Sequence, residues 1–236
     1  MRRSDFLGAC STVAAATLVG ETPATAVAGI TIPDTPLARD ATSAARSAEP
    51  TEIFNHSLRT FLFAELIANA KAVPHDRETV YIAAILHDTG LTKAHMSKTE
   101  RFEVDGANVA RELLQRHGVT GARADLIWDA ISLHDSGGIA RWKQPEVMLV
   151  NAGVSADFGG YLDLLQRNDV IGVLSTAPRT GFIPVFLDAV ASVARLKGFA
   201  TGNCFVTDVA YRLVPGFHLE NFCDAVKEDP FAGYGV

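Results

Sequence analysis

From residue 51 onward, apolar side chains recur at intervals of three and four residues, which is the spacing of helices with one buried face. Gly and Pro residues separate the apolar runs. We find no run of alternating β-branched residues bounded by turns, so no sheet is expected. The pattern predicts an all-α fold, a helical bundle around a central cleft. The predicted helices are 53–72, 77–88, 100–117, 121–135, 144–158, 160–167, 184–196 and 219–227.

The first 50 residues follow a different pattern. Residues 1–28 begin with Arg2 and Arg3, continue into an apolar stretch of small residues and end in Ala-x-Ala text, which is typical of a signal peptide. The paired arginines favour the twin-arginine export route, and an amphipathic or disordered tail is the alternative. We therefore expect export to the periplasm or the extracellular space, and otherwise a cytoplasmic protein.

The remaining chain divides into a linker and one domain. Residues 29–50 are rich in Ala, Ser, Thr and Pro without clear periodicity and are predicted to be a linker or a loosely held arm. Residues 51–236 are long enough for a single helical domain. Cys204 and Cys223 would remain after cleavage of the leader, either as a disulfide or as free thiols.

The net charge of the chain limits the kinds of molecule that it is expected to bind. The 236 residues carry a net charge of −6 and contain no Lys/Arg run, which argues against a nucleic-acid surface. The sequence contains no stretch of 18 apolar residues, so no membrane span is predicted. We expect a small-molecule substrate, and the sequence leaves the oligomeric state open, homo-oligomers included.

Two stretches place a His-Asp pair after an apolar run, "AAILHDTGL" at 83–91 and "AISLHDSGG" at 130–138. In the first, the helix is apolar around most of its circumference, so His87 and Asp88 are expected at the inner end of a buried helix. A buried carboxylate needs a partner, and a divalent metal ion would supply one. The alternative is a pair of ordinary polar residues at a helix end.

His56 and Asp157 are expected to point inward as well. His56 shares a helix face with Phe63 and Ile67, where a core histidine is the alternative to a ligand. Asp157 continues the apolar stripe of Val150 and Val154, and its alternative is a helix-end residue turned to solvent. His87 follows His56 by 31 residues, and Asp157 follows Asp88 by 69.

This order and spacing resemble the HD-domain superfamily of metal-dependent hydrolases. Within that superfamily, the text of residues 51–165 is most similar to the cyanamide hydratases, in "FNHSLRTFLFAELIA", "AAILHDTGLT", "RFEVDGANVARELL", "AISLHD" and "EVMLVNAGVSADFGG". The resemblance implies an all-α fold and one or two divalent metal ions held by His56, His87, Asp88 and Asp157, and we expect one ion. It also implies zinc and the hydration of cyanamide to urea. A mixed N/O ligand set suits Fe²⁺ or Mn²⁺ as well.

Hydration also requires a group that carries protons. His134 shares a face with Ile127 and Ile131, so it should point into the cleft as an acid/base group or a substrate contact. Lys93, five residues after Asp88, could stabilise developing negative charge, and a solvated surface lysine is its alternative.

Two other functions stay open. An HD-type phosphohydrolase acting on a nucleotide or a small phosphoester should carry cationic phosphate clamps, for which Arg59, Lys93 and Arg141 are the candidates. A non-enzymatic binding protein on a degenerate scaffold should not retain all four ligand positions.

Overall fold

The computed structural model describes residues 26–198 and 205–235, and within them the chain is almost entirely helical. The sheet is one antiparallel hairpin of two short strands, β1 (Ala26–Val27) and β2 (Ile30–Thr31). The prediction of an all-α fold is confirmed. The helices are α1 (Pro36–Ala48), α2 (Thr51–Lys71), α3 (Arg77–Leu86), η1 (Thr89–Leu91), α4 (Phe102–Arg116), α5 (Ala122–Ser132), α6 (Gly137–Ala140), α7 (Pro145–Asp157), η2 (Leu162–Leu164), α8 (Arg167–Thr176), α9 (Phe182–Lys197), α10 (Phe205–Leu213), α11 (Phe222–Ala225) and η4 (Ala232–Tyr234).

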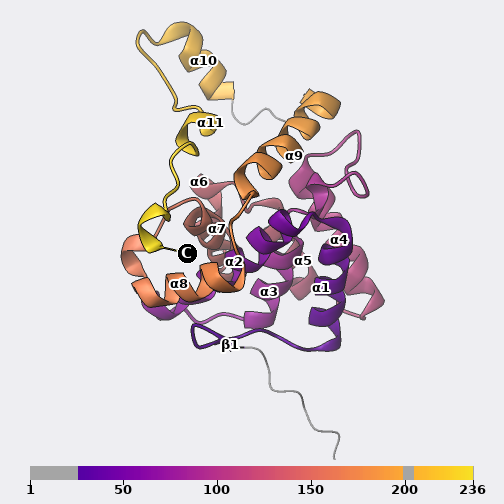
Figure 1. Ribbon diagram of the computed structural model, residues 1–236. Coiled ribbons are helices and arrows are strands. Elements are labelled where there is room, and N and C mark those ends of the chain that lie inside the picture. Colours follow the sequence, from indigo (N-terminus) through magenta and orange to yellow (C-terminus); the bar gives the residue numbers. More distant parts are fainter. Residues whose placement is uncertain (1–25, 199–204, 236) are drawn as a thin grey trace, which may run out of the picture.

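Helix α2 is the centre of the bundle, and most of its length is buried. Figure 1 shows α2 and α7 in the middle of the molecule, with α3 and α5 packed beside them. Even the charged Glu65 in α2 is fully buried, where His75 Nε2 and Arg77 Nε each lie 2.6 Å from one of its carboxylate oxygens. The functional side chains described below all lie on or beside these central helices.

Two glycines set the closest approaches between elements. A Cβ atom at Gly153 in α7 would lie 2.1 Å from the carbonyl oxygen of Thr60, so only glycine lets α7 pack this closely on α2. A Cβ atom at Gly90 would lie 1.9 Å from the carbonyl oxygen of Phe102, at the start of α4. Both contacts fix the backbone within a few residues of the candidate site.

The prediction of a linker over 29–50 is wrong for most of its length. Thr35 caps helix α1 by accepting a hydrogen bond from the Ala38 amide, and Pro36 occupies the first helical turn, where a missing N–H costs nothing. Leu37, Ala41 and Ala45 recur at helical spacing and are buried. Small side chains let α1 pack closely on the body, so a composition typical of linkers belongs here to a core helix.

The C-terminal third differs from its prediction in detail. The segment 160–167 does not form the predicted helix, because Tyr161 adopts the left-handed conformation (φ 59°) and only the short η2 follows it. Helices α8 and α10 were not predicted, and α11 covers only part of 219–227. Helix α9 extends the predicted 184–196 by two residues at its start and one at its end.

Two predictions concern residues that lie wholly or partly outside the described ranges. Residues 1–25 of the predicted signal peptide and Cys204 are among them, while Cys223 is an exposed free cysteine. Val27, near the end of the predicted leader, packs into the core and is 6% exposed.

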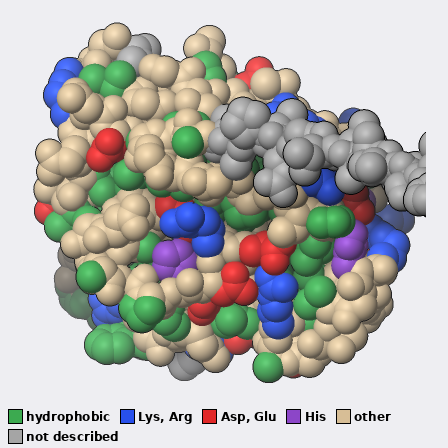
Figure 2. Space-filling view, turned by 90° about the horizontal axis from the view of Figure 1, so that it is seen from below, with side chains coloured by type: hydrophobic (Ala, Val, Ile, Leu, Met, Phe, Trp, Pro, Cys, Tyr) green, Lys and Arg blue, Asp and Glu red, His purple; other side chains and the backbone are tan. Residues whose placement is uncertain are grey.

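Within the described part of the chain, no helix is long and apolar enough to cross a membrane. On the face seen from below, acidic and basic side chains are intermingled (Figure 2).

Candidate metal centre

Two helices bring His56, His87 and Asp88 together in the interior. His56 lies near the start of α2, and His87 and Asp88 directly follow α3. All three are at most 1% exposed. His56 Nε2 lies 3.3 Å from His87 Nε2 and 3.6 Å from Asp88 Oδ2, and His87 Nε2 lies 3.4 Å from the same oxygen. The structure thus joins three of the four predicted ligands.

The hydrogen bonds of the two imidazoles determine which nitrogens face each other. His87 Nδ1 lies 2.6 Å from the carbonyl oxygen of Ala84, and a carbonyl only accepts, so Nδ1 carries the hydrogen. His56 Nδ1 donates in the same way to Asp157 Oδ2, at 2.7 Å. In the neutral rings both Nε2 atoms therefore turn a lone pair toward the Asp88 carboxylate.

This cluster fits a divalent metal ion. Asp88 Oδ2 is buried and has no hydrogen-bond partner among the described residues, which is costly for a carboxylate. Two imidazole lone pairs and a carboxylate repel one another unless a cation lies between them. Burial lowers the pKa of His87 to about 3, which keeps this ring neutral and able to ligate. The mixed N/O donor set is one that zinc, iron and manganese accept.

His134 lies beside the cluster, as predicted. It directly follows the residue that caps α5 and is 3% exposed. Its Nδ1 donates to the carbonyl oxygen of Ile131 at 2.7 Å, so its Nε2 is also free in the neutral ring. That Nε2 lies 3.8 Å from Asp88 Oδ1, and the ring centroid lies 4.7 Å from that of His87. His134 can thus act as an acid/base group or as a further ligand.

The two His-Asp stretches share their histidine geometry and differ in their aspartates. In both, the imidazole Nδ1 donates to the carbonyl three residues earlier. Asp88 is buried in the cluster, whereas the Asp135 side chain is 37% exposed and lies 3.4 Å from Arg101. Only the first pair therefore contributes both residues to the metal centre.

Asp157 occupies a different place from the one predicted. Both of its carboxylate oxygens are taken by hydrogen bonds, from Arg59 Nε (2.7 Å), from the other Arg59 nitrogen (2.8 Å), from Arg179 (2.7 Å) and from His56 Nδ1. It contacts the side of the His56 ring that faces away from the cluster. In this arrangement Asp157 lies outside the cluster and orients His56, and its role as a fourth ligand stays a prediction.

The charge on Asp157 is stabilised by these contacts. Burial alone would raise its pKa, but the guanidinium of Arg59 and the hydrogen bond from His56 hold it below its ordinary value. Arg179 also binds the backbone carbonyl oxygen of Asp157, at 2.5 Å. No sequence pattern pointed to Arg179, which lies 22 residues from Asp157 in the loop before α9.

A cavity of about 680 Å³ opens onto the cluster. His56, Asp88 and His134 lie on its wall, and much of the rest is aromatic. The other lining residues are Phe102, Asp135, Arg141, Asn151, Val154, Ser155, Phe158, Tyr161, Phe186, Val190 and Phe222. The centre is therefore open to a small molecule on one side.

The structure does not bring Lys93 to the cluster, so its catalytic role stays a prediction. Lys93 is exposed and lines a different cavity, formed with Ile53, Thr92 and the first half of α9. The short helix η1 (Thr89–Leu91) lies between Asp88 and Lys93 in the chain.

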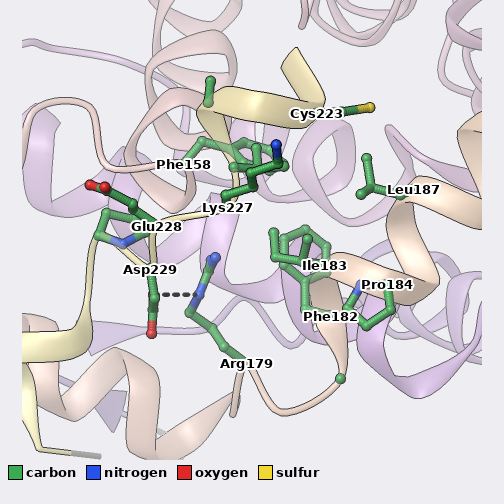
Figure 3. A pocket seen from close by; sticks show the side chains of 14 residues that line it. Phe158, Arg179, Phe182, Ile183, Pro184, Leu187, Cys223, Lys227, Glu228 and Asp229 are labelled. Atoms are coloured by element: carbon green, nitrogen blue, oxygen red, sulfur yellow. Dashed lines mark ion pairs between the residues drawn. The ribbon is translucent and has the colours of Figure 1, made fainter. Parts of the chain in front are cut away.

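A second cavity, of about 440 Å³, lies on the other side of Phe158. Figure 3 shows Arg179, Phe182 and Asp229 around it, with Arg179 Nε 3.9 Å from Asp229 Oδ1. The Phe182 ring stacks on His56 at a centroid distance of 4.8 Å. Phe182 and Arg179 thus separate this cavity from the metal centre.

Two further residues near the centre were missed. Asn151 donates from its amide to the carbonyl oxygen of His134 at 2.7 Å and so fixes the segment that carries this histidine. Glu49 is buried with one carboxylate oxygen unpartnered. Burial, together with the negative charge of Asp88, raises the pKa of Glu49 well above its ordinary value. Glu49 was not singled out from the sequence because it lies in the predicted linker, directly after α1.

Comparison with known families agrees with this geometry. Residues 53–156 match the family model described as the HD domain. This segment is therefore similar to HD domains. It contains His56, His87, Asp88 and His134, and it ends one residue before Asp157. HD domains bind divalent metal ions, and His56, His87 and Asp88 form a group whose ligand atoms could hold one.

Two curated relatives are similar to a longer part of the chain than residues 53–156. The cyanamide hydratases DDI2 and DDI3 of Saccharomyces cerevisiae (strain ATCC 204508 / S288c) are each 29% identical to this chain over 145 residues. The aligned region covers 58% of this chain and 64% of each relative, which is less than two-thirds of their length.

Proposed function

We propose that this protein is a metal-dependent hydratase that adds water to the C≡N bond of a small nitrile-like molecule, such as cyanamide, to give urea. The observation that carries the proposal is the donor set at the base of the cavity. There, His56 Nε2 and His87 Nε2 lie 3.6 Å and 3.4 Å from Asp88 Oδ2, which has no hydrogen-bond partner among the described residues. The similarity to two proteins named cyanamide hydratase supports the substrate.

The proposed cofactor is one divalent ion, Zn²⁺ first and Fe²⁺ or Mn²⁺ as alternatives, held by His56, His87 and Asp88. When bound, such an ion lowers the pKa of water and polarises an electrophile. The role of Asp157 is to keep the hydrogen on His56 Nδ1, so that Nε2 remains a donor to the ion.

His134 is the proposed proton carrier. Its Nε2 faces the cavity side of Asp88 with no hydrogen attached in the neutral ring. It would accept a proton from water as the water oxygen bonds to the substrate carbon, and return it to the substrate nitrogen. The Asn151 amide holds the backbone of His134 in place for both transfers.

The cavity favours this reaction over phosphoester hydrolysis. Arg141 is the one Lys or Arg among the described residues that line it. Of the other predicted phosphate clamps, Arg59 is bound to Asp157 and Lys93 lines a different cavity. A phosphate group carries more negative charge than one exposed arginine balances.

The test is to load the purified protein with zinc, iron or manganese and to measure urea formed from cyanamide. We expect urea from the wild-type protein and none from the His87→Ala variant, which lacks a ligand. No urea above that control with any of the three metals would refute the proposed substrate, and phosphate release in a screen of phosphoesters would then favour the alternative.

A further inference from the structure

The cavity beside the metal centre is much larger than cyanamide requires. Its volume is about 680 Å³. A molecule with three non-hydrogen atoms takes the space of about two water molecules, roughly 60 Å³. Cavities of several hundred Å³ typically enclose ligands with a ring or a branched body. Most of this cavity would hold only water if cyanamide were bound.

The walls nearest the metal centre are aromatic. Phe102 at the start of α4 lies with its ring centroid 5.6 Å from that of His134. Phe158 and Phe186 lie 5.5 Å and 5.9 Å from the His56 ring. The apolar surface therefore begins directly beside the proposed ligands, where the substituent of a bound nitrile would lie.

Phe222 forms the outer part of this wall. It comes from the short helix α11, and its ring lies 5.5 Å from Phe158 and 6.3 Å from Phe186. The residue is 48% exposed, so its aromatic surface is still open to contact with a ligand. An apolar substituent would bury this surface and gain the free energy of leaving water.

The charges on the cavity wall do not select a charged substituent. Asp135 and Arg141 carry opposite signs, and Asp135 already lies 3.4 Å from Arg101. Asn151 and Ser155 add neutral polar groups. The polar part of the wall thus suits the nitrile end of a substrate and the aromatic part suits its body.

We propose that this site prefers a nitrile-type substrate that carries an apolar, ring-sized substituent, such as an aryl cyanamide, over cyanamide itself. The proposal rests on the proposed hydratase function. The reaction is the same addition of water across C≡N: the water oxygen bonds to the carbon and both hydrogens end on the nitrogen. Nothing leaves, and no oxidant or reductant is needed.

The experiment compares phenylcyanamide with cyanamide on the metal-loaded, full-length protein. Burial of a ring of this size predicts that kcat/KM for phenylcyanamide exceeds that for cyanamide by about tenfold or more. Since the two compounds differ in intrinsic reactivity, the second measurement is inhibition by the products. Phenylurea should inhibit at concentrations about tenfold or more below those of urea.

The variant Phe222→Ala isolates the aromatic wall. It should lower kcat/KM for phenylcyanamide by about threefold to tenfold and leave that for cyanamide nearly unchanged, because only the larger substrate reaches Phe222. Leu219→Ala is the matched control. It removes a side chain of the same C-terminal segment that is 47% exposed and lies outside the cavity wall, so both substrates should be unaffected.

The outcomes separate the two proposals. Hydration of cyanamide with no preference for phenylcyanamide, or equal inhibition by urea and phenylurea, would overturn this inference and leave the hydratase function standing. Equal losses for both substrates in Phe222→Ala would overturn it as well. Hydration of neither compound would overturn the proposed function, and this inference with it.

Discussion

His56 Nδ1 lies 2.7 Å from Asp157 Oδ2, although the two residues are 101 positions apart in the chain. This contact fixes the hydrogen on one side of the imidazole and thereby leaves the other nitrogen free to face Asp88. Arg59 and Arg179 hold the carboxylate in place. In this structure Asp157, expected to be a ligand, orients the candidate ligand His56.

The first prediction concerns Asp157→Asn. The amide can turn its NH₂ group toward His56 and force the hydrogen onto Nε2, so the metal affinity should fall by about 10- to 100-fold. Competition with a chelator measures this fall, and Asp163→Asn, an exposed aspartate nearby in sequence, is the control. The absorption spectrum of the cobalt-substituted variant should match that of the wild type, which would show that the metal keeps the same ligands. A spectrum that shows loss of an oxygen ligand would mean that Asp157 binds the metal directly.

The second prediction separates the two roles open to His134. If it carries protons, His134→Gln should lower kcat by about 10²- to 10⁴-fold while the metal content per chain stays that of the wild type. Metal analysis and kinetics on the same preparation provide the test. Loss of the metal along with activity would make His134 a ligand.

Lys93 provides the third prediction. Because its side chain lines a cavity separate from the metal centre, Lys93→Ala should leave kcat/KM for cyanamide within about twofold of the wild type, as surface substitutions away from a site usually do. Steady-state kinetics measure the effect. A loss of activity comparable to that of His134→Gln would place Lys93 in the catalytic machinery after all.

The fourth prediction concerns the pH dependence of stability in the metal-free protein. Burial and the charge of Asp88 raise the pKa of Glu49, so above the ordinary pKa of a glutamate, about 4.3, the unfolded state has lost a proton that the folded state keeps. Stability must then fall as the pH rises from there toward the raised folded value. Glu49→Gln should raise Tm at pH 7 and flatten this dependence, and thermal unfolding between pH 4 and pH 8 measures both. An unchanged pH profile would show that Glu49 is ionised in the folded protein.

The fifth prediction tests the contact that brings α7 to α2. Gly153→Ala would place a Cβ atom 2.1 Å from the carbonyl oxygen of Thr60, so the helices must separate. We expect a loss of about 1–3 kcal/mol in the free energy of unfolding, as for other overpacked sites. Gly172→Ala is the matched control, since its Cβ would meet only ordinary contacts in α8. In Gly172→Ala the free energy of unfolding should rise by up to about 1 kcal/mol, because the unfolded chain has lower entropy. Chemical denaturation compares the two variants. Equal stabilities would contradict the close approach.

The sequence alone determined the helical class of the fold and singled out His56, His87 and Asp88, which the structure brings together. Helical spacing reports burial directly, so the central helices α2, α3, α4, α5 and α7 were predicted to within a few residues. His87 and Asp88 stood out because the Asp88 carboxylate, at the end of an almost entirely apolar helix, needs a partner. Helix α1 was missed because its buried face is built mostly from alanine, whose spacing is a weak signal beside a composition typical of linkers.

Only the tertiary structure decided which side of each residue faces the metal centre. Arg59 and Arg179 contact Asp157 although they lie 98 and 22 positions from it in the chain. No local sequence pattern reveals such pairing. Lys93 is close to Asp88 in sequence, but it follows the short helix η1 and lines a different cavity. Periodicity specifies how a side chain points relative to its own helix. The partners it meets depend on how the helices cross. Here the close approaches are possible because Gly90 and Gly153 lack a side chain.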